Sequence, residues 1–290
     1  MTECNANPRR TRPGEGSVRV GIGGWSFAPW RGTFYPEGLP QREELAHASR
    51  ALGMIEINST FYRSATPKQY ATWRDATPDG FVFSVKAPRY TTQRHTLADA
   101  GESIERFVTG GVTELGDKLG PLLWQLPPSR VFDAGDLRAF LAMLPRQQHG
   151  ITLRHVVEVR HASFLQREWL TLARRYGVGC VFTDSPDYPS FADPTSDVIY
   201  ARLMNASERR KAGYTPRALD GWARVCRVWS QGGTPAELPR IEPAAPAPSG
   251  PRDVFILFIN GYKPRAPAAA LALQTRLADA GAGRTRHQKC

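Results

Sequence analysis

Eight short segments rich in β-branched and other apolar residues recur along the chain, and they constrain its fold more than any other feature. In chain order they span residues 18–22 (VRVGI), 54–58 (MIEIN), 81–86 (FVFSVK), 121–126 (PLLWQL), 156–160 (VVEVR), 180–184 (CVFTD), 198–203 (VIYARL) and 254–260 (VFILFIN). Apolar residues at helical spacing lie between most of them, as in Ile104 to Leu115, Leu165 to Tyr176 and Leu219 to Trp229. Strands that alternate with amphipathic helices form a parallel sheet, and eight such units close into a barrel. We therefore predict an α/β fold, a TIM-type (β/α)8 barrel.

The chain length agrees with a single barrel domain. It has 290 residues, and barrels of this type commonly need about 250. We expect the barrel over residues 17–280, a disordered basic arm over 1–16 and a basic tail over 281–290. The sixth crossover, SPDYPSFADPTSD, is Pro-rich and too short for a full helix, so it should be a loop or a single turn. Residues 232–251 are rich in Pro and Ala without periodicity, which predicts a mobile insert before the eighth strand.

Charge and cysteine content narrow the partners and the compartment. The net charge is +11, with basic residues concentrated between Glu208 and Arg227 and after Lys263. This favours an anionic small molecule or a nucleic acid as partner. The four cysteines form no CxxC pair and are typical of reduced thiols. No segment approaches the roughly 20 apolar residues of a membrane span, so we expect a cytoplasmic protein without membrane contact.

Polar residues recur on one face of these strands, close to where each strand ends. Side chains alternate along a strand, so Ile55 and Ile57 should face the helices while Glu56 points into the barrel. The predicted inward polar residues are Glu56, Asn58, Ser84, Lys86, Gln125, Glu158, Arg160, Asp184, Arg202 and Asn260. Active sites of such barrels lie at the C-terminal ends of the strands, so we predict a polar, basic pocket there. Alternatively, salt bridges of Glu56 with Lys86 and Glu158 with Arg160 only close the barrel top.

Six sequence blocks point to a known family. In chain order they are VGIGGWSFAPWRGTFYP, EINSTFYR, FSVKAPR, LGPLLWQLPPS, VEVRHASF and TDSP, between about Val18 and Leu277. Together they closely resemble the YecE-like family, domain of unknown function 72, which implies a TIM-type barrel but supplies no activity. The seventh strand continues as Leu203-Met204-Asn205 where the family tends to show Leu-His-Gly. The last strand ends in Asn260-Gly261 where the family usually has Asn-Asn or Asn-Asp.

The residue types at the strand ends favour a hydrolase of the phosphoester class acting on a phosphorylated or nucleic-acid-derived substrate. Glu56, Glu158 or Asp184 would serve as base, and Lys86 would stabilise developing negative charge. His161 would bind a metal or orient a carboxylate. The predicted substrate-binding residues are Trp25, Asn58, Tyr62, Gln125, Arg160, Arg202, Tyr214, Asn260 and Lys263. Four aromatic residues would either stack on a base or sugar at the rim or pack beneath the barrel top, and they are Trp25, Trp30, Tyr62 and Tyr90.

The sequence leaves the cofactor open, with a single divalent cation as one candidate. Mg²⁺ and Mn²⁺ prefer oxygen ligands, which Glu56, Glu158 and Asp184 would supply. Several zinc ions are not expected, because His161 alone among the six histidines lies at a strand end. No nicotinamide or flavin is expected either, because the glycines after the first strand do not form a GxGxxG motif.

Two other functions stay open. Glu56 and Glu158 have the residue types of a glycoside hydrolase pair, although they lie three strands apart. A non-catalytic protein that binds an anionic ligand or nucleic acid would use the same basic pocket. Met204, which stands where the family has a histidine, favours this last hypothesis.

Overall fold

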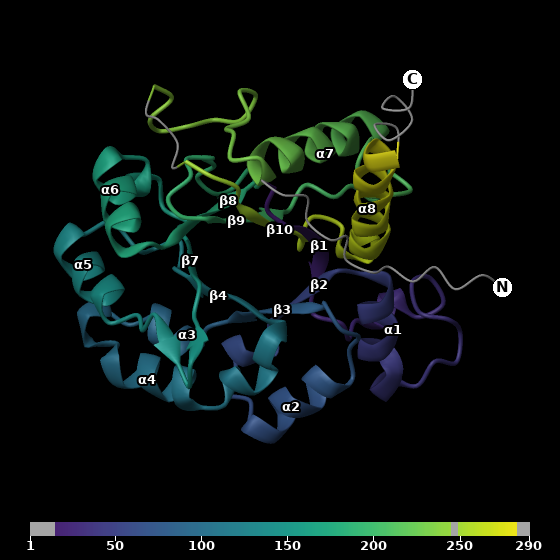
Figure 1. Cartoon of the computed structure of the whole chain (residues 1–290), viewed down its shortest axis with the longest axis horizontal. Helices are drawn as coiled ribbons and strands as arrows, with labels where there is room; N and C mark the ends of the chain where they lie inside the picture. The colour runs from purple at the N-terminus through teal and green to yellow at the C-terminus, as the bar shows by residue number, and fades with distance from the viewer. Residues whose placement is uncertain (1–14, 245–248, 283–290) are drawn as a thin grey trace.

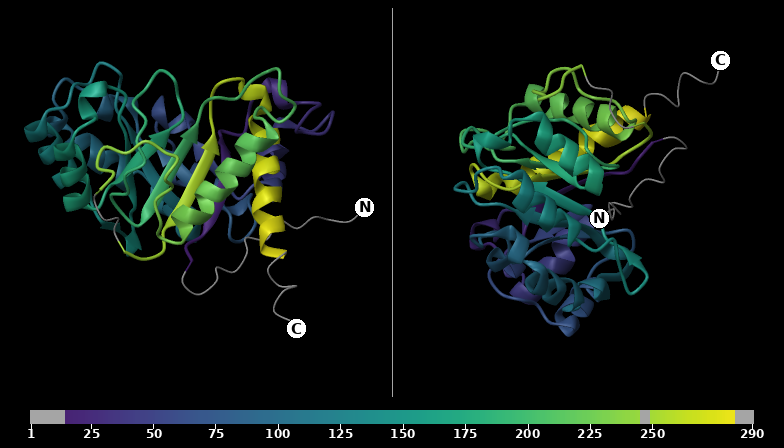
Figure 2. Two further views of the ribbon diagram at one scale, coloured as in Figure 1. Left: turned by 90° about the horizontal axis from the view of Figure 1, so that it is seen from above. Right: turned by 90° about the vertical axis from the view of Figure 1, so that its left-hand side faces the viewer.

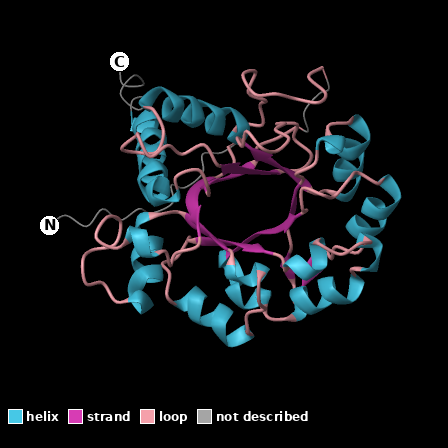
Figure 3. Ribbon diagram, turned by 180° about the vertical axis from the view of Figure 1, so that it is seen from behind, coloured by secondary structure: helices cyan, strands magenta, loops and turns pink. Residues whose placement is uncertain are grey.

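Eight parallel strands close into one barrel in the computed structural model, which describes residues 15–244 and 249–282 (Figure 3). The barrel strands are β1 (Val18–Gly23), β2 (Met54–Ile57), β3 (Val82–Lys86), β4 (Leu119–Gln125), β7 (His155–Glu158), β8 (Gly179–Thr183), β9 (Val198–Leu203) and β10 (Asp253–Phe258). Each pairs with its neighbours in the chain, and β10 pairs with β1 to close the ring. The predicted TIM-type barrel is confirmed, and every predicted strand forms with small differences at its ends.

Helices cover the outside of the ring (Figures 1 and 2). They are α1 (Glu44–Ala51), α2 (Pro67–Asp75), α3 (Arg89–Thr92), α4 (Gly101–Thr109), α5 (Ala134–Ala142), α6 (Arg167–Tyr176), α7 (Pro216–Ser230) and α8 (Ala266–Ala282). Short 3-10 turns are η1 (Ala28–Trp30), η2 (Gln41–Glu43), η3 (Ser59–Phe61), η4 (Leu97–Asp99), η5 (Val112–Lys118), η6 (Ala162–Phe164) and η7 (Lys263–Arg265). No helix within residues 15–244 and 249–282 is long and apolar enough to cross a membrane.

The apolar spacing from Ile104 to Leu115 does not form one continuous helix. α4 ends at Thr109, and the chain turns at Gly111, whose φ is 106°, before η5 begins. A Cβ at Gly111 would lie 2.6 Å from Cα of Pro67, so a glycine is required where this turn meets α2. A small antiparallel hairpin, β5 (Gln147–Gln148) and β6 (Ile151–Thr152), was not predicted.

The sixth crossover, between β8 and β9, is a loop as predicted. The insert packs on this loop. The buried Asp193 carboxylate accepts the backbone N–H groups of Ile241 and Glu242 at 2.7 and 3.0 Å. The Glu242 carboxylate in turn pairs with Arg174 of α6 at 2.6 Å. Mobility of the insert stays a prediction, and its residues 245–248 lie outside the described residues. So do residues 1–14 of the predicted arm (1–16) and residues 283–290 of the predicted tail (281–290), whose first two residues belong to α8.

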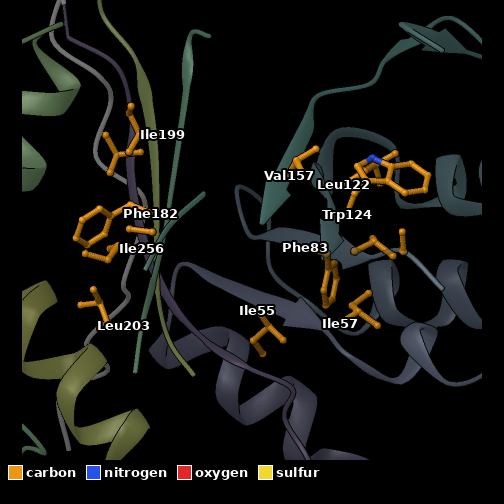
Figure 4. Close-up of a cluster of buried hydrophobic side chains, with 14 of the residues drawn as sticks. Ile55, Ile57, Phe83, Leu122, Trp124, Val157, Phe182, Ile199, Leu203 and Ile256 are labelled. Carbon is orange, nitrogen blue, oxygen red and sulfur yellow. The ribbon is translucent and has the colours of Figure 1, made fainter. Parts of the chain in front are cut away.

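Apolar side chains form separate layers on the two faces of the barrel strands. Outward residues such as Ile55, Phe83 and Val157 pack beneath the helices (Figure 4). Inward residues fill the barrel, and they are Met54, Val82, Leu123, Val156, Val181, Val198, Tyr200, Phe255, Leu257 and Ile259. The predicted alternation is therefore confirmed in β2, β3 and β7, and the inward polar residues lie above this apolar plug.

Candidate functional site

Two glutamates and one arginine form a buried ion-pair network at the C-terminal end of the barrel interior. Arg202 of β9 donates from Nε and Nη2 to Oε2 and Oε1 of Glu56 in β2, at 3.1 and 3.0 Å. Its Nη1 donates to Oε2 of Glu158, the last residue of β7. The glutamate side chains are fully buried and that of Arg202 is 3% exposed. Both carboxylates therefore share one guanidinium group.

A hydrogen-bonded pair supports this network from the layer below. The Tyr200 hydroxyl donates to Oε2 of Glu56 at 2.7 Å, and Ser84 Oγ lies 2.7 Å from the same hydroxyl. Because the Tyr200 proton points to Glu56, Ser84 is the donor of the second bond. Ser84 lies two residues before Lys86 on the same inward face of β3. The Glu56 carboxylate is thus held by two residues of β9 from across the barrel, with Ser84 of the neighbouring strand β3 supporting Tyr200.

Glu158 is surrounded by further donors. Arg160 Nε and Gln125 Nε2 donate to its Oε1 at 2.5 and 3.0 Å. Burial on its own favours the neutral acid, but the charges of Arg202 and Arg160 outweigh burial and lower the pKa of Glu158 to about 2. At neutral pH Glu158 is therefore ionised and has no proton to donate. The predicted Glu158–Arg160 salt bridge is confirmed.

Lys86 differs from the arginines because its ammonium has no ion pair or hydrogen bond with any described residue. Nζ lies 3.9 Å from the centroid of the Phe61 ring. Lys86 is the last residue of β3 and is 7% exposed. Burial, and then repulsion from Arg202, lower the pKa of Lys86 to about 8. The predicted Glu56–Lys86 salt bridge is wrong, because Arg202 and Tyr200 occupy the Glu56 carboxylate.

Cations and aromatic rings surround the barrel mouth. The Arg160 guanidinium lies 4.2 Å from the Tyr188 ring centroid, and Lys263 Nζ lies 4.6 Å from that of Phe27. Burial lowers the pKa of Lys263. Tyr62 is 69% exposed, with Arg89 5.7 Å above its ring. These cations give this end of the barrel a basic character, because the carboxylates of Glu56 and Glu158 are already paired with Arg202 and Arg160.

Two predicted site residues have structural contacts instead. Trp25 packs edge-on against Trp73 and Phe83, at ring distances of 5.3 and 6.4 Å, so its ring belongs to the core beneath the helices. His161 caps η6, where its Nδ1 accepts from the backbone N–H and the hydroxyl of Ser163 at 3.2 and 2.8 Å. Neither contact places these side chains on the Glu56–Arg202–Glu158 network. Asn58, half-buried, donates to the backbone carbonyl of Glu56 at 3.4 Å.

Asp184 does not point into the barrel, and this corrects the prediction for the sixth strand. Val181 belongs to the interior plug while Phe182 packs outward, so alternation turns Asp184 outward as well. Its carboxylate accepts the Met204 backbone N–H and, at 3.1 Å, the Tyr214 hydroxyl. Burial raises the pKa of Asp184 to about 6, and burial likewise raises the pKa of Tyr214.

The three carboxylates proposed as metal ligands are consequently not gathered together. Among residues 15–244 and 249–282, no group of three His, Cys, Asp or Glu side chains could hold a metal ion. Arg202 holds Glu56 and Glu158, and Asp184 is bound to Met204 and Tyr214. The geometry therefore gives no support to the predicted Mg²⁺ or Mn²⁺ ligand set.

A cleft of about 500 Å³ opens beside the network, between the loops that follow β8, β9 and β10. Its lining residues are Ser185, Pro186, Asp187, Tyr188, Met204, Asn205, Ala206, Asn260 and Gly261. Asn260 was predicted as a site residue but as an inward one, whereas it is exposed beyond the end of β10. The sequence analysis missed Asp187 and Tyr188. The sequence signal that could have found them is an acidic and an aromatic residue between two prolines, Pro186 and Pro189, in the loop that follows β8.

Comparisons with known proteins agree with this architecture. A family model described as "Protein of unknown function DUF72" matches residues 19–289. The UPF0759 protein YecE of Escherichia coli K12 is 30% identical over 190 residues, which span 63% of this chain and 64% of that protein, less than two thirds of its length. A DUF72 family structure from Thermotoga maritima has a TM-score of 0.69 at 23% identity, covering 90% of this chain and 99% of the other. One from Enterococcus faecalis has 0.63 at 16%, covering 91% and 99%. These structures show the same fold.

Proposed function

The chain belongs to the DUF72 family, and from that premise we propose that the C-terminal end of its barrel binds a phosphorylated ligand and hydrolyses its phosphoester bond. The observation behind this proposal is the Lys86 ammonium, which is nearly buried and has no ion partner among the described residues. A buried charge is unfavourable unless it is paired, and a phosphate would supply the missing partner. Arg160 and Lys263 add positive charge to the same mouth.

The chemistry of the cations fits a phosphoryl group. Lys86 and Arg160 would donate to its oxygens and stabilise the negative charge that develops during transfer. Water would attack phosphorus as the bond to the leaving oxygen breaks. Lys86, with a pKa of about 8, is protonated at neutral pH and would give that oxygen a proton. The proton brought by the water would then restore the ammonium through the released phosphate.

The glutamates support a binding role better than an acid–base pair. Both share Arg202, and Glu158 stays ionised at neutral pH. A glycoside hydrolase needs one carboxylic acid with a raised pKa, so these contacts weaken that hypothesis. They favour, as a second candidate, a non-catalytic protein that binds the anion without turnover.

Phosphate titration with matched lysine variants tests the proposal. Calorimetry would measure the affinity for inorganic phosphate in the wild type, in Lys86→Met and in the control Lys68→Met, which changes an exposed lysine of α2. We expect at least tenfold weaker binding in Lys86→Met and no change in the control. Equal affinity in all three proteins contradicts the proposal.

Turnover separates the two candidates. Release of p-nitrophenol from p-nitrophenyl phosphate would be followed in the same three proteins. Hydrolysis lost in Lys86→Met supports the hydrolase, whereas Lys86-dependent binding without hydrolysis of this or any phosphoester in a substrate panel supports the binding protein.

A further inference from the structure

One residue connects the cleft between the loops after β8, β9 and β10 with the cationic end of the barrel, where Lys86 and Arg160 lie. Tyr188 lines the cleft, and its ring also lies beneath the Arg160 guanidinium, at 4.2 Å. Arg160 in turn donates to Glu158 of the buried network. A single small ligand can therefore contact Arg160 and extend into the cleft.

The cleft itself has a different chemistry from the mouth. Its lining contains no lysine or arginine, but it contains Asp187, Asn205 and Asn260. All three are exposed, and the side chains of Asp187 and Asn260 make no hydrogen bond or ion pair with another described residue. A carboxylate and an amide without partners offer acceptors and donors for hydroxyl groups. The charge of Asp187 disfavours a phosphate inside the cleft itself.

We propose that the cleft binds the sugar portion of a phosphorylated sugar whose phosphate lies on Lys86 and Arg160. This inference rests on the proposed function and specifies its substrate class. The volume of about 500 Å³ falls within the range of small-ligand sites. Polar groups that converge on such a cleft fix a ligand's orientation, and hydroxyl groups pair with both a carboxylate and an amide.

Backbone contacts keep the cleft walls together. Ala206 and Gly261 form an isolated parallel bridge, and the Tyr262 N–H donates to the Ala206 carbonyl at 2.7 Å. A Cβ at Gly261 would lie 2.5 Å from the Ala206 backbone and 2.7 Å from the Met204 carbonyl oxygen. Met204 and Gly261 therefore lie next to each other in the cleft wall, with no room for a side chain at Gly261.

Calorimetric titrations with four compounds test the proposal: ribose 5-phosphate, adenosine 5′-monophosphate, inorganic phosphate and free ribose. In the wild type we expect ribose 5-phosphate to bind at least tenfold more tightly than inorganic phosphate. Asp187→Ala and Asn260→Ala should each weaken ribose 5-phosphate binding about three- to tenfold, the range for a lost ligand hydrogen bond. Phosphate binding should change by less than about twofold, because neither side chain reaches the phosphate.

The control variant is Asp79→Ala, which removes an exposed carboxylate before β3, at the opposite end of the barrel. It should leave all four affinities unchanged. Adenosine monophosphate distinguishes two sources of the same chemistry: tighter binding than ribose 5-phosphate supports a nucleotide, and weaker binding supports a free sugar phosphate. The inference is overturned if ribose 5-phosphate binds no more tightly than phosphate, or if both cleft variants bind it like the wild type. Absence of any Lys86-dependent phosphate binding would instead overturn the proposed function.

Discussion

Arg202 donates two parallel hydrogen bonds to the Glu56 carboxylate, from Nε to Oε2 at 3.1 Å and from Nη2 to Oε1 at 3.0 Å. The planar guanidinium matches the two carboxylate oxygens, and its remaining Nη1 is free to reach Glu158. A lysine in this place could not bind both carboxylates in the same geometry. Two buried carboxylates on different strands therefore share this one cation, and Glu158 has a second cationic partner in Arg160.

Removing that cation should destabilise the protein strongly. Arg202→Met would leave Glu56 without its bidentate partner and weaken the pairing of Glu158 inside the barrel. Breaking a buried pair from one side typically lowers the free energy of unfolding by about 3–5 kcal/mol. Urea unfolding would measure the change. The control is Arg42→Met in the exposed Arg42–Glu43 pair, where we expect a change within about 0.5 kcal/mol. A loss below about 1 kcal/mol in Arg202→Met would show that the network does not hold the barrel top.

Glu158 should make the protein sensitive to acid. Its pKa is about 2 in the folded protein and near 4.5 in an unfolded chain, so folding favours the ionised form. The resulting stability is present above pH 5 and is lost as the pH falls through the folded value near 2. It amounts to something on the order of 3 kcal/mol. Urea midpoints at pH 7, 4 and 3 should fall more steeply in the wild type than in Glu158→Gln. Parallel pH profiles in the two proteins would contradict the assignment.

The regular alternation of side chains made much of the network predictable. Glu56, Lys86, Glu158 and Arg202 lie on the inward face that the sequence predicted, because residues of the interior apolar layer precede them on the same face of each strand. These residues are Met54, Val82, Val156 and Tyr200. The ion pairs among these residues were harder to predict. Alternation predicts on which face of a strand a side chain lies, but it does not predict which charged residue of another strand contacts it. The sequence therefore predicted Lys86 as the partner of Glu56, whereas the partner in the structure is Arg202.

The sixth strand shows where this reasoning fails. In CVFTD every residue but the last can face either the plug or the helices, so composition gives no phase for the alternation. Phe182 packs against Trp222 and Trp229 of α7, and this contact, which is distant in sequence, turns Asp184 out of the barrel.

The sequence also failed to predict the cleft, for a related reason. Loop side chains follow no period, so Asp187 and Asn260 meet only through the three-dimensional arrangement of the strand ends.

Asp184 should give a pH dependence opposite to that of Glu158. Burial raises its pKa to about 6, above the value near 3.8 of an unfolded chain. The folded state therefore binds the proton more tightly, and the stability from this group is full below pH 4 and lost as the pH rises through 6. Asp184→Asn should remove this component while its amide oxygen still accepts the Met204 N–H. Urea midpoints from pH 4 to 7 in both proteins would measure it, and an identical profile would show that Asp184 titrates elsewhere.

The pH dependence of sulfate binding should test whether the Lys86 ammonium binds the anion. Sulfate is used in place of phosphate because its own charge does not change over this pH range. Because the pKa of Lys86 is about 8, its charge is present at pH 6–7 and disappears above pH 8. Sulfate affinity should be constant up to pH 7 and then fall by roughly tenfold per pH unit above about 8. Lys86→Arg keeps its charge throughout and should bind sulfate without this fall. Calorimetry across the range would decide, and a pH-independent affinity in the wild type would mean that Lys86 does not contact the anion.

A side chain at Gly261 should disrupt the cleft wall. Comparison with Gly32 separates the effect of a steric clash from that of backbone strain. Gly261 and Gly32 have nearly the same left-handed backbone, with φ of 75° and 74°. A Cβ at Gly32 meets nothing within 4 Å, whereas one at Gly261 would lie 2.5 Å from the Ala206 backbone. Gly32→Ala should therefore lower the free energy of unfolding by about 1 kcal/mol, from backbone strain alone. Gly261→Ala adds a clash with a neighbouring loop and should lower it by about 2–4 kcal/mol. Urea unfolding of both variants would measure the difference. Equal losses would mean that the loops after β9 and β10 can separate freely, and the cleft would then lack the fixed wall that a ligand-selective site requires.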